Sequence, residues 1–181
     1  MKEIRLHGLG GLGTVKAGEI IVYASVMEGN YGNSFPFFGF EREGAPVVSY
    51  VRLGDEPIRP KNQVYKPNCV IVLEPAVMNA VDVYQGLKPD SVLVLNTTHT
   101  DIDKFDIPPT VKTVALVDAT KIAMETLGRP ITNTTILASF AKATGWVDCK
   151  YLKDRISQLF GEKNVDAFDK GYELTKVIEI H

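Results

Sequence analysis

Three short, almost uninterrupted apolar runs constrain this sequence more than any other feature. They cover residues 69–73, 92–95 and 113–117, and none is long enough to form a stable helix by itself. Such runs are typical of strands that are buried on both faces, as in a parallel sheet. The residues between and after them carry helical patterns. The alternation predicts an α/β fold with a largely parallel sheet.

The remaining pattern completes this predicted architecture. Residues 4–7 and 31–35 are further strand candidates, and residues 47–53 are rich in β-branched side chains. No clear helix separates 47–53 from its predecessor, so this strand is a candidate for antiparallel pairing. Helices are expected over residues 12–28, 76–87, 119–128, 134–144, 149–160 and 165–178. We therefore expect one domain over residues 1–181: a three-layer, Rossmann-like fold with a helical C-terminal tail.

Composition excludes several classes of function. The 181 residues include 20 basic and 22 acidic side chains, and this balance disfavours a nucleic-acid partner. Two cysteines, Cys69 and Cys149, are too few for a disulfide framework, a four-cysteine zinc site or a self-contained iron–sulfur cluster. The histidines are far apart, so no metal site is expected. The sequence shows no signal peptide and no apolar run of the roughly 20 residues that cross a bilayer, which predicts a cytoplasmic protein without membrane contact.

A glycine-rich turn, residues 8–13, joins the first predicted strand to the first predicted helix and fits the pattern G-x-G-x-x-G. Glycines permit a tight turn and a close approach of backbone amides to a ligand, and the helix N-terminus then favours an anion. Three explanations remain open: a dinucleotide, another phosphate or anion, and a tight turn without any ligand. The candidate ligand contacts are Gly8, Gly10, Gly11, Gly13, Thr14 and Lys16.

A dinucleotide site requires a further residue that this chain lacks. In that fold an acidic side chain at the end of the second strand holds the ribose. Residues 31–35 contain no Asp or Glu, and Glu28 lies before the strand, on the helix. The missing acid counts against NAD or FAD.

A second signature, residues 38–47, places two acids and one arginine among aromatic residues and glycines. A solvated loop seldom carries so much aromatic surface. Arg and aromatic side chains are enriched in protein interfaces. We expect Phe38, Glu41 and Arg42 at a subunit interface; a solvated loop is the alternative.

Together the two signatures resemble the γ subunits of the 2-oxoacid:ferredoxin oxidoreductases, the family that includes pyruvate:ferredoxin oxidoreductase (pyruvate synthase). The resemblance covers about residues 5–145 and extends to the turn at 52–58 and to segments 94–97, 117–120 and 133–134. Two positions depart from it. Many members have a polar or basic residue at the position of Leu9 and a glutamine at the position of Leu12. The two leucines argue against binding of a polar ligand by side chains of the turn, but not against binding by its backbone amides.

The resemblance implies a CoA-dependent oxidative decarboxylation of a 2-oxoacid, pyruvate first, with electrons passed to ferredoxin. Thiamine diphosphate, magnesium and iron–sulfur clusters do the chemistry in such enzymes. This chain has too few cysteines for a cluster, and residues 54–56 lack the second glycine of a Gly-Asp-Gly thiamine diphosphate motif. We expect it to bind none of these cofactors and to supply no catalytic residue. It would support α, β and δ subunits, with CoA contacting the glycine turn, and would be inactive alone.

Several alternatives stay open. The substrate of the complex is pyruvate, a branched-chain 2-oxoacid such as 2-oxoisovalerate, or 2-oxoglutarate. From other classes, the chain is a stand-alone nucleotide-binding or NAD(P)-dependent protein, or a purely structural assembly module. Among single residues, Asp118 is expected to cap a helix, and Cys149 lies at a helix start, where a thiol pKa is often lowered.

Overall fold

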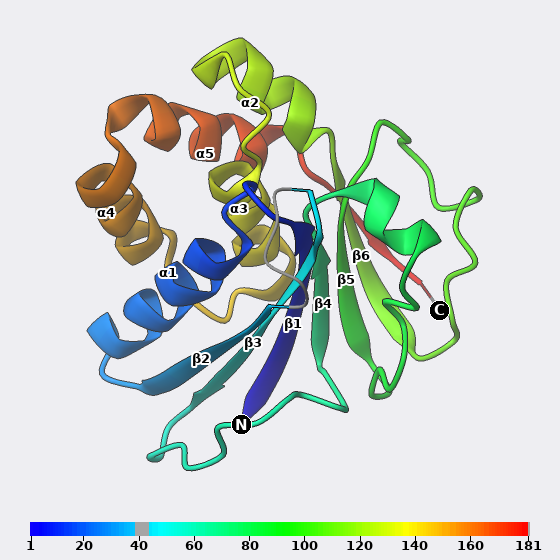
Figure 1. Ribbon diagram of the computed structural model, residues 1–181, viewed down its shortest axis with the longest axis vertical. Coiled ribbons are helices and arrows are strands. Elements are labelled where there is room, and N and C mark those ends of the chain that lie inside the picture. The colour runs from blue at the N-terminus through cyan, green and yellow to red at the C-terminus, as the bar shows by residue number, and fades with distance from the viewer. Residues whose placement is uncertain (39–43, 181) are drawn as a thin grey trace.

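A computed structural model describes residues 1–38 and 44–180, with Phe38 described by its backbone alone (Figure 1). One seven-stranded sheet in the order β2-β3-β1-β4-β5-β6-β7 forms the centre. The strands are β1 (Lys2–Leu9), β2 (Tyr31–Phe38), β3 (Pro46–Gly54), β4 (Cys69–Val72), β5 (Ser91–Asn96), β6 (Val111–Val117) and β7 (Lys176–Glu179). The helices are α1 (Thr14–Met27), η1 (Pro75–Asn79), α2 (Ala119–Leu127), α3 (Asn133–Thr144), α4 (Cys149–Phe160) and α5 (Glu162–Leu174).

The strand directions confirm the predicted α/β fold. Strands β1, β4, β5 and β6 are mutually parallel neighbours. On one side, β3 pairs antiparallel with β1 and with the edge strand β2, and on the other β7 pairs antiparallel with β6. The predicted antiparallel pairing of residues 47–53 is therefore correct. Its cause is the short connection from β2 to β3, which leaves no room for a crossover helix.

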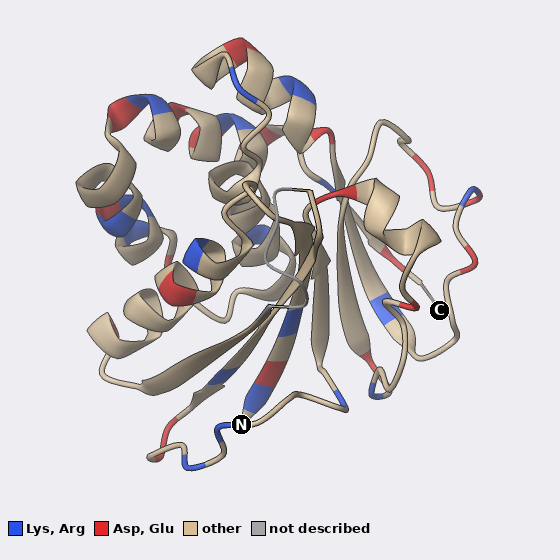
Figure 2. Cartoon of the chain, viewed as in Figure 1, with Lys and Arg blue, Asp and Glu red and all other residues tan. Residues whose placement is uncertain are grey.

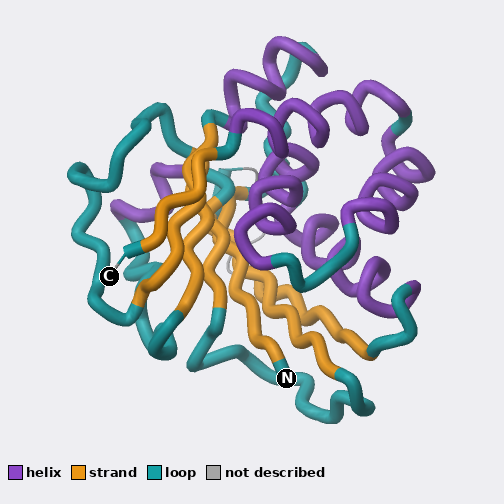
Figure 3. The backbone as a smooth tube through the Cα atoms, turned by 180° about the vertical axis from the view of Figure 1, so that it is seen from behind, coloured by secondary structure: helices purple, strands orange, loops and turns teal. Residues whose placement is uncertain are grey.

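All five α-helices cover one face of the sheet (Figure 3). Alternate strand residues such as Leu6, Ile71 and Val94 pack there against apolar side chains of the helices, including Ile21 and Phe140. The other face of β4–β6 is covered differently. Val72, Leu93 and Leu116 pack against Val77 and Val83 and against loop residues such as Phe105. The third layer thus consists of a short 3₁₀ helix and loops.

The helix predicted over residues 76–87 is wrong. Only the 3₁₀ turn η1 forms, and the chain then continues as turns. The buried guanidinium of Arg5 on β1 donates hydrogen bonds to the carbonyl oxygens of Val83 (2.9 Å) and Gln85 (2.7 Å). Gly86 has φ 77°, and its Cα lies against the backbone of Tyr65. The apolar spacing had suggested a helix, but Arg5 holds this segment in turns on the sheet.

The predicted helical tail is correct only in part. Helix α5 ends at Leu174, Thr175 is extended with ψ 126°, and the chain then forms the edge strand β7. The hydroxyl of the buried Thr175 contacts that of Ser139 and donates to the carbonyl of Gly171. These contacts fix the exit from the helix, and the β-branched residues that follow favour the strand.

Charged residues lie mainly on α4, α5 and the loops, while β4 and β5 are almost free of them (Figure 2). The largely buried carboxylate of Glu3 accepts hydrogen bonds from Arg52, which is itself buried, and from Lys88, each at 3.1 Å. Among residues 1–38 and 44–180, no helix is both long enough and apolar enough to span a bilayer.

Candidate functional site

The candidate site lies where the parallel strands β1 and β4 end. The chain leaves β1 toward one side of the sheet and continues from β4 toward the other. In open α/β sheets, ligands bind in the crevice outside the carboxyl ends of such strands. The side chains of Asn96 and Thr132 both donate to the carbonyl of Leu73, which follows β4, and this fixes the floor of the site.

The glycine turn at the end of β1 depends on three glycines. Gly11 and Gly13 have φ 89° and 77°, a conformation that residues with a Cβ avoid. A β-carbon on Gly13 would lie 2.3 Å from Nδ2 of Asn133, and one on Gly8 would lie 2.1 Å from Oγ1 of Thr14. The turn is therefore tight against both the start of α1 and the start of α3.

The turn and the start of α1 leave several polar groups without described partners. Gly13 is the N-cap of the 14-residue helix α1, and no side chain caps it. Within the described part of the chain, the N–H groups of Thr14, Val15 and Lys16 have no acceptor, whereas Ala17 N–H donates to Gly13 O at 2.9 Å and Gly10 N–H donates to Ala45 O at 2.8 Å. The hydroxyl of Thr14 is buried and has no described partner. Unpaired amides at a helix N-terminus favour an anion.

Lys16, in the first turn of α1, forms an ion pair with a neighbouring acid. Its Nζ is 3.0 Å from Oε2 of Glu19, and both side chains are about half exposed. An exposed pair of this kind is weak, with a coupling of about 0.2–1 kcal/mol. Lys16 therefore retains the freedom to turn toward an anion, and Glu19 competes for it.

The two sequence signatures meet in space. Gly10 N–H donates to Ala45 O, and Gly44 N–H donates to Gly10 O at 3.4 Å, so the glycine turn lies against the end of the second signature. Glu41 and Arg42 fall outside the described residues, as does the side chain of Phe38.

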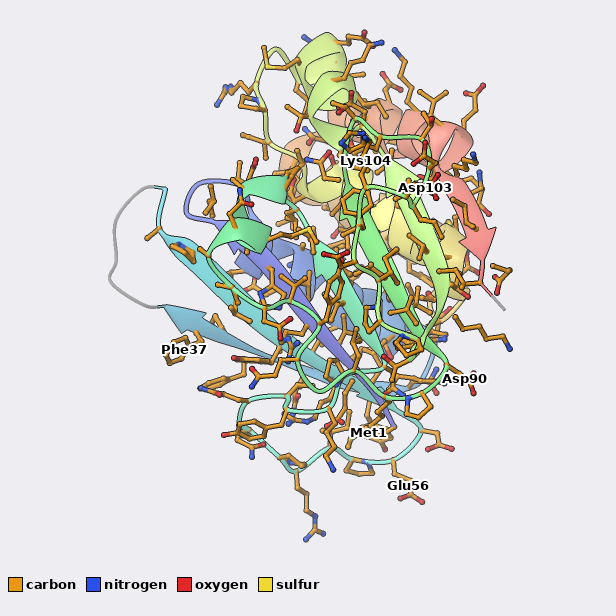
Figure 4. All side chains as sticks on the ribbon, turned by 90° about the vertical axis from the view of Figure 1, so that its right-hand side faces the viewer. Met1, Phe37, Glu56, Asp90, Asp103 and Lys104 are labelled. Atoms are coloured by element: carbon orange, nitrogen blue, oxygen red, sulfur yellow. The ribbon has the colours of Figure 1, made fainter. Side chains whose placement is uncertain are left out.

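The neighbouring aromatic residues on the edge strand β2 are exposed. Phe35 and Phe37 retain 39% and 47% of their accessible surface. Figure 4 shows Phe37 at the rim of the molecule, at the end of its strand. Exposed large aromatic side chains on an edge strand are typical of a contact surface.

His7, directly before the turn, is buried and neutral. Its Nε2 accepts a hydrogen bond from Nε of Arg5 at 3.0 Å, so its proton is on Nδ1, which has no acceptor among the described residues. Burial, and next the charge of Arg5, lower the pKa of His7 to about 3. At neutral pH it neither exchanges protons nor carries charge, which makes it a structural residue.

Several other candidates have structural roles. Asp118 caps α2 by accepting from Lys121 N–H at 3.0 Å, as predicted. Asn96 accepts from Ala119 N–H and donates to Leu73 O, which uses both ends of its amide. Cys149 does not have the lowered pKa that a helix start often gives a thiol, because burial and the nearby Asp148 raise the pKa.

The sheet topology argues against a classical dinucleotide site. In that fold the strand beside β1 is parallel to it and carries the ribose-binding acid. Here β4 is the parallel neighbour of β1 on one side, but the strand on the other side is the antiparallel β3, and β2, the strand that follows α1, lies at the sheet edge. Residues 1–38 and 44–180 contain no group of three or more His, Cys, Asp or Glu side chains placed to hold a metal.

Two basic residues near the turn, Arg129 and Lys163, were not among the residues predicted from the sequence. Both line a cavity of about 680 Å³ next to Asn133. The only local signal was a basic residue within two positions of a glycine that ends a helix: Arg129 directly follows Gly128, and Lys163 follows Gly161 after Glu162.

Comparison with known proteins identifies the family. The family model for pyruvate ferredoxin/flavodoxin oxidoreductase matches residues 3–174. The chain is 46% identical to the pyruvate/ketoisovalerate oxidoreductases common subunit gamma of Pyrococcus abyssi, over 99% of this chain and 100% of that protein. It is 44% identical to pyruvate synthase subunit PorC of Methanothermobacter thermautotrophicus, covering 100% of this chain and 99% of the other.

A solved structure agrees with these sequence matches. The crystal structure of pyruvate oxidoreductase subunit PORC from Thermotoga maritima superposes with a TM-score of 0.82 at 31% identity, over 98% of both chains. The matched regions include the glycine turn, the second signature and all five α-helices. The chain therefore belongs to the pyruvate ferredoxin/flavodoxin oxidoreductase family.

Proposed function

We propose that this chain is the γ subunit of a pyruvate:ferredoxin oxidoreductase, which oxidatively decarboxylates pyruvate to acetyl-CoA and passes two electrons to ferredoxin. The observation that carries the proposal is the end-to-end match to γ and PorC subunits. Expression of the tagged chain with its partner subunits, followed by an assay of CoA-dependent, viologen-reducing decarboxylation, tests it. The complex should be active with pyruvate, and the chain alone should be inactive.

In this proposal the cofactors belong to the partner subunits. The α, β and δ subunits hold thiamine diphosphate, magnesium and iron–sulfur clusters, and ferredoxin accepts the electrons outside the complex. Cys69 is buried and Cys149 is half-buried, and the two thiols are this chain's only ones. A cluster needs more thiolates than these. We expect the complex to be cytoplasmic, where ferredoxin is available.

The glycine turn is the proposed contact for a phosphate of CoA. The unpaired amides at the start of α1 and the buried hydroxyl of Thr14 support this role. Calorimetric titration of the assembled complex with CoA tests it. A Gly11→Val, Thr14→Val variant should bind CoA at least tenfold more weakly while still assembling. Unchanged CoA affinity would overturn the contact.

The second signature is the proposed interface with a partner subunit, through Phe38, Glu41 and Arg42. The exposed neighbours Phe35 and Phe37 on β2 support it. An Arg42→Glu variant should weaken assembly in size-exclusion chromatography, whereas Arg155→Glu, on the helical face, serves as a matched control. Normal assembly and turnover in Arg42→Glu would show that this loop is not an interface.

The identity of the 2-oxoacid is a separate question. The relative in Pyrococcus abyssi is named as a subunit common to pyruvate and ketoisovalerate oxidoreductases. This favours 2-oxoisovalerate as the second candidate, ahead of 2-oxoglutarate. Assays of the purified complex with all three acids would rank them. NAD(P)-dependent activity of the chain alone, without partner subunits, would instead support the stand-alone nucleotide-binding alternative.

A further inference from the structure

The two edge strands of the sheet differ in how they are protected from other chains. Strand β7 has four residues and carries Lys176 and Glu179, and short, charged edges resist pairing with another strand. Strand β2 has eight residues and no charged side chain (Figure 2). Its outer side pairs with no strand among residues 1–38 and 44–180. A long, uncharged edge is a template for another chain, so β2 is the edge that invites one.

The register of the sheet fixes which backbone groups of β2 face outward. The carbonyls of Glu3 and His7 on β1 accept from the amides of Asn68 and Leu73, on the β4 side. Backbone groups of successive residues point to opposite sides of a strand, so the even-numbered residues of β1 bond to β3. Through the pairings of β3, the odd-numbered residues of β2 bond to β3 as well. The residues of β2 that face outward are therefore Gly32, Ser34, Pro36 and Phe38.

The proline agrees with this assignment. Pro36 has no N–H group, so it is tolerated in a strand where its nitrogen faces away from the neighbouring strand. On the outer edge, Pro36 still offers its carbonyl to a donor. It removes one donor from the edge and leaves those of the other three residues.

The odd-numbered residues form a row of aromatic side chains beside this edge. Gly32 faces the helices, because a β-carbon there would lie 3.2 Å from Cγ1 of Val22 on α1. Side chains alternate between the two faces of a strand, so the odd-numbered residues lie on the face away from α1. Three of them are large and retain 45%, 39% and 47% of their accessible surface: Tyr31, Phe35 and Phe37.

We propose that two copies of this chain pair antiparallel through β2, about a twofold axis at Phe35. Gly32 of each copy then exchanges two hydrogen bonds with Phe38 of the other. Ser34 N–H donates to the carbonyl of Pro36, which returns none. An axis at Ser34 is less favourable, since it pairs fewer of the outward-facing groups.

A second copy is the occupant that this pattern favours. An edge without charge has nothing to attract a strongly acidic or basic partner, whereas the twofold register matches the edge with itself. Phe35 lies directly opposite Phe35 of the second copy, and Asn33 lies opposite Phe37. Aromatic pairs across two strands stabilise the pairing.

The size of the contact limits its strength. An aromatic side chain covers about 150–250 Å² when buried, so the exposed parts of the three aromatic residues amount to roughly 200–330 Å² per copy. The strand backbone adds to this area, but a standard interface buries about 800 Å² per partner. We therefore expect a reversible dimer whose fraction rises with concentration in the micromolar range.

Sedimentation equilibrium of the full chain, without partner subunits, tests the pairing. Phe35→Lys places two like charges opposite each other at the axis and should raise the dissociation constant of the dimer at least tenfold. Tyr172→Lys on α5 is the matched control, since it makes the same charge change at an aromatic residue that is 42% exposed, and it should leave the constant unchanged. A wild type that stays monomeric over this range, or equal effects of the two variants, would overturn the proposal.

Disulfide trapping in a Cys149→Ser background tests the register and does not require a strong dimer. Phe35→Cys should cross-link two copies under mild oxidation, because facing residues of a non-hydrogen-bonded pair have Cα atoms about 4.5 Å apart, within disulfide range. Asn33→Cys should not cross-link, because its copy lies four positions along the strand, roughly 13 Å away. Equal cross-linking at both positions, or none at Phe35, would contradict an axis there.

The proposal extends the proposed interface of the second signature from its loop to the strand before it. The two contacts fail separately. Sedimentation and trapping use the chain alone and test β2, whereas assembly of the complex with Arg42→Glu tests the loop. A monomeric chain whose Arg42→Glu variant still loses its partner subunits would overturn the β2 pairing and keep the loop interface.

Discussion

Acidification should destabilise this fold through one residue, His7. In the folded chain its pKa is about 3, compared with 6.5 when it is exposed, because the imidazole is buried beside the cation of Arg5. Between these two values the unfolded chain binds one more proton than the folded chain. The free energy of unfolding therefore decreases as the pH falls below about 6.5, and this decrease continues until about pH 3.

The size of this loss of stability follows from the lowered pKa of His7. Each pH unit in this window costs about 1.4 kcal/mol, so acidification to pH 5 removes about 2 kcal/mol. Urea unfolding of the wild type and of His7→Gln at pH 7, 6 and 5 measures it. Glutamine keeps an acceptor for Nε of Arg5 and does not titrate. Contributions from carboxylates are common to both proteins and cancel in the difference.

The expected result is a wild type that loses about 2 kcal/mol more than His7→Gln between pH 7 and pH 5. Parallel pH profiles for the two proteins would refute the reasoning. They would mean that the imidazole is protonated in the folded state at pH 5, which requires a partner for Nδ1 and contradicts its buried, unpaired environment.

Two further predictions concern the turn and the thiols. Gly13→Ala should destabilise the chain by about 1–3 kcal/mol more than Gly29→Ala in thermal unfolding, because both have a positive φ but only Gly13 lies against a side chain, that of Asn133. Equal losses would remove the steric argument. A thiol reagent should modify Cys149 in the folded protein and Cys69 only after unfolding, because Cys69 is fully buried and its raised pKa keeps the thiol protonated. Mass spectrometry follows the modification over time. Rapid modification of both Cys69 and Cys149 in the folded protein would show that the core opens.

The interior strands of the parallel part of the sheet were predictable because their burial shows in short local apolar runs, whereas the edge strand β7 was expected to be helical. The apolar runs at residues 69–73, 92–95 and 113–117 became β4, β5 and β6, all in the centre of the sheet. The helix expected over 76–87 was not predictable in this way. Its apolar spacing is helical, but its carbonyls bind Arg5, which lies about 80 residues earlier. A distant buried cation thus outweighed local propensity.

The candidate site, too, was predictable from the sequence only in part. The glycine turn was predictable, because a strand, a run of glycines and a helix are consecutive in the sequence. The wall formed by Asn133 was not, since 120 residues separate it from Gly13. Arg129 and Lys163 come together only when the starts of α3 and α5 meet. These contacts depend on how the helices pack against one another, and the sequence pattern does not specify that packing.

Subunit assembly tests the central claim most directly. The tagged chain is purified under anaerobic conditions from the cells in which it is made naturally. Proteins that copurify are identified, and CoA-dependent reduction of viologen by pyruvate is measured on the same sample. The proposal predicts a complex with subunits that carry thiamine diphosphate and iron–sulfur clusters, and activity that disappears when CoA is omitted. A chain that copurifies with no such subunit, or a complex without this activity on any 2-oxoacid, would contradict the proposal.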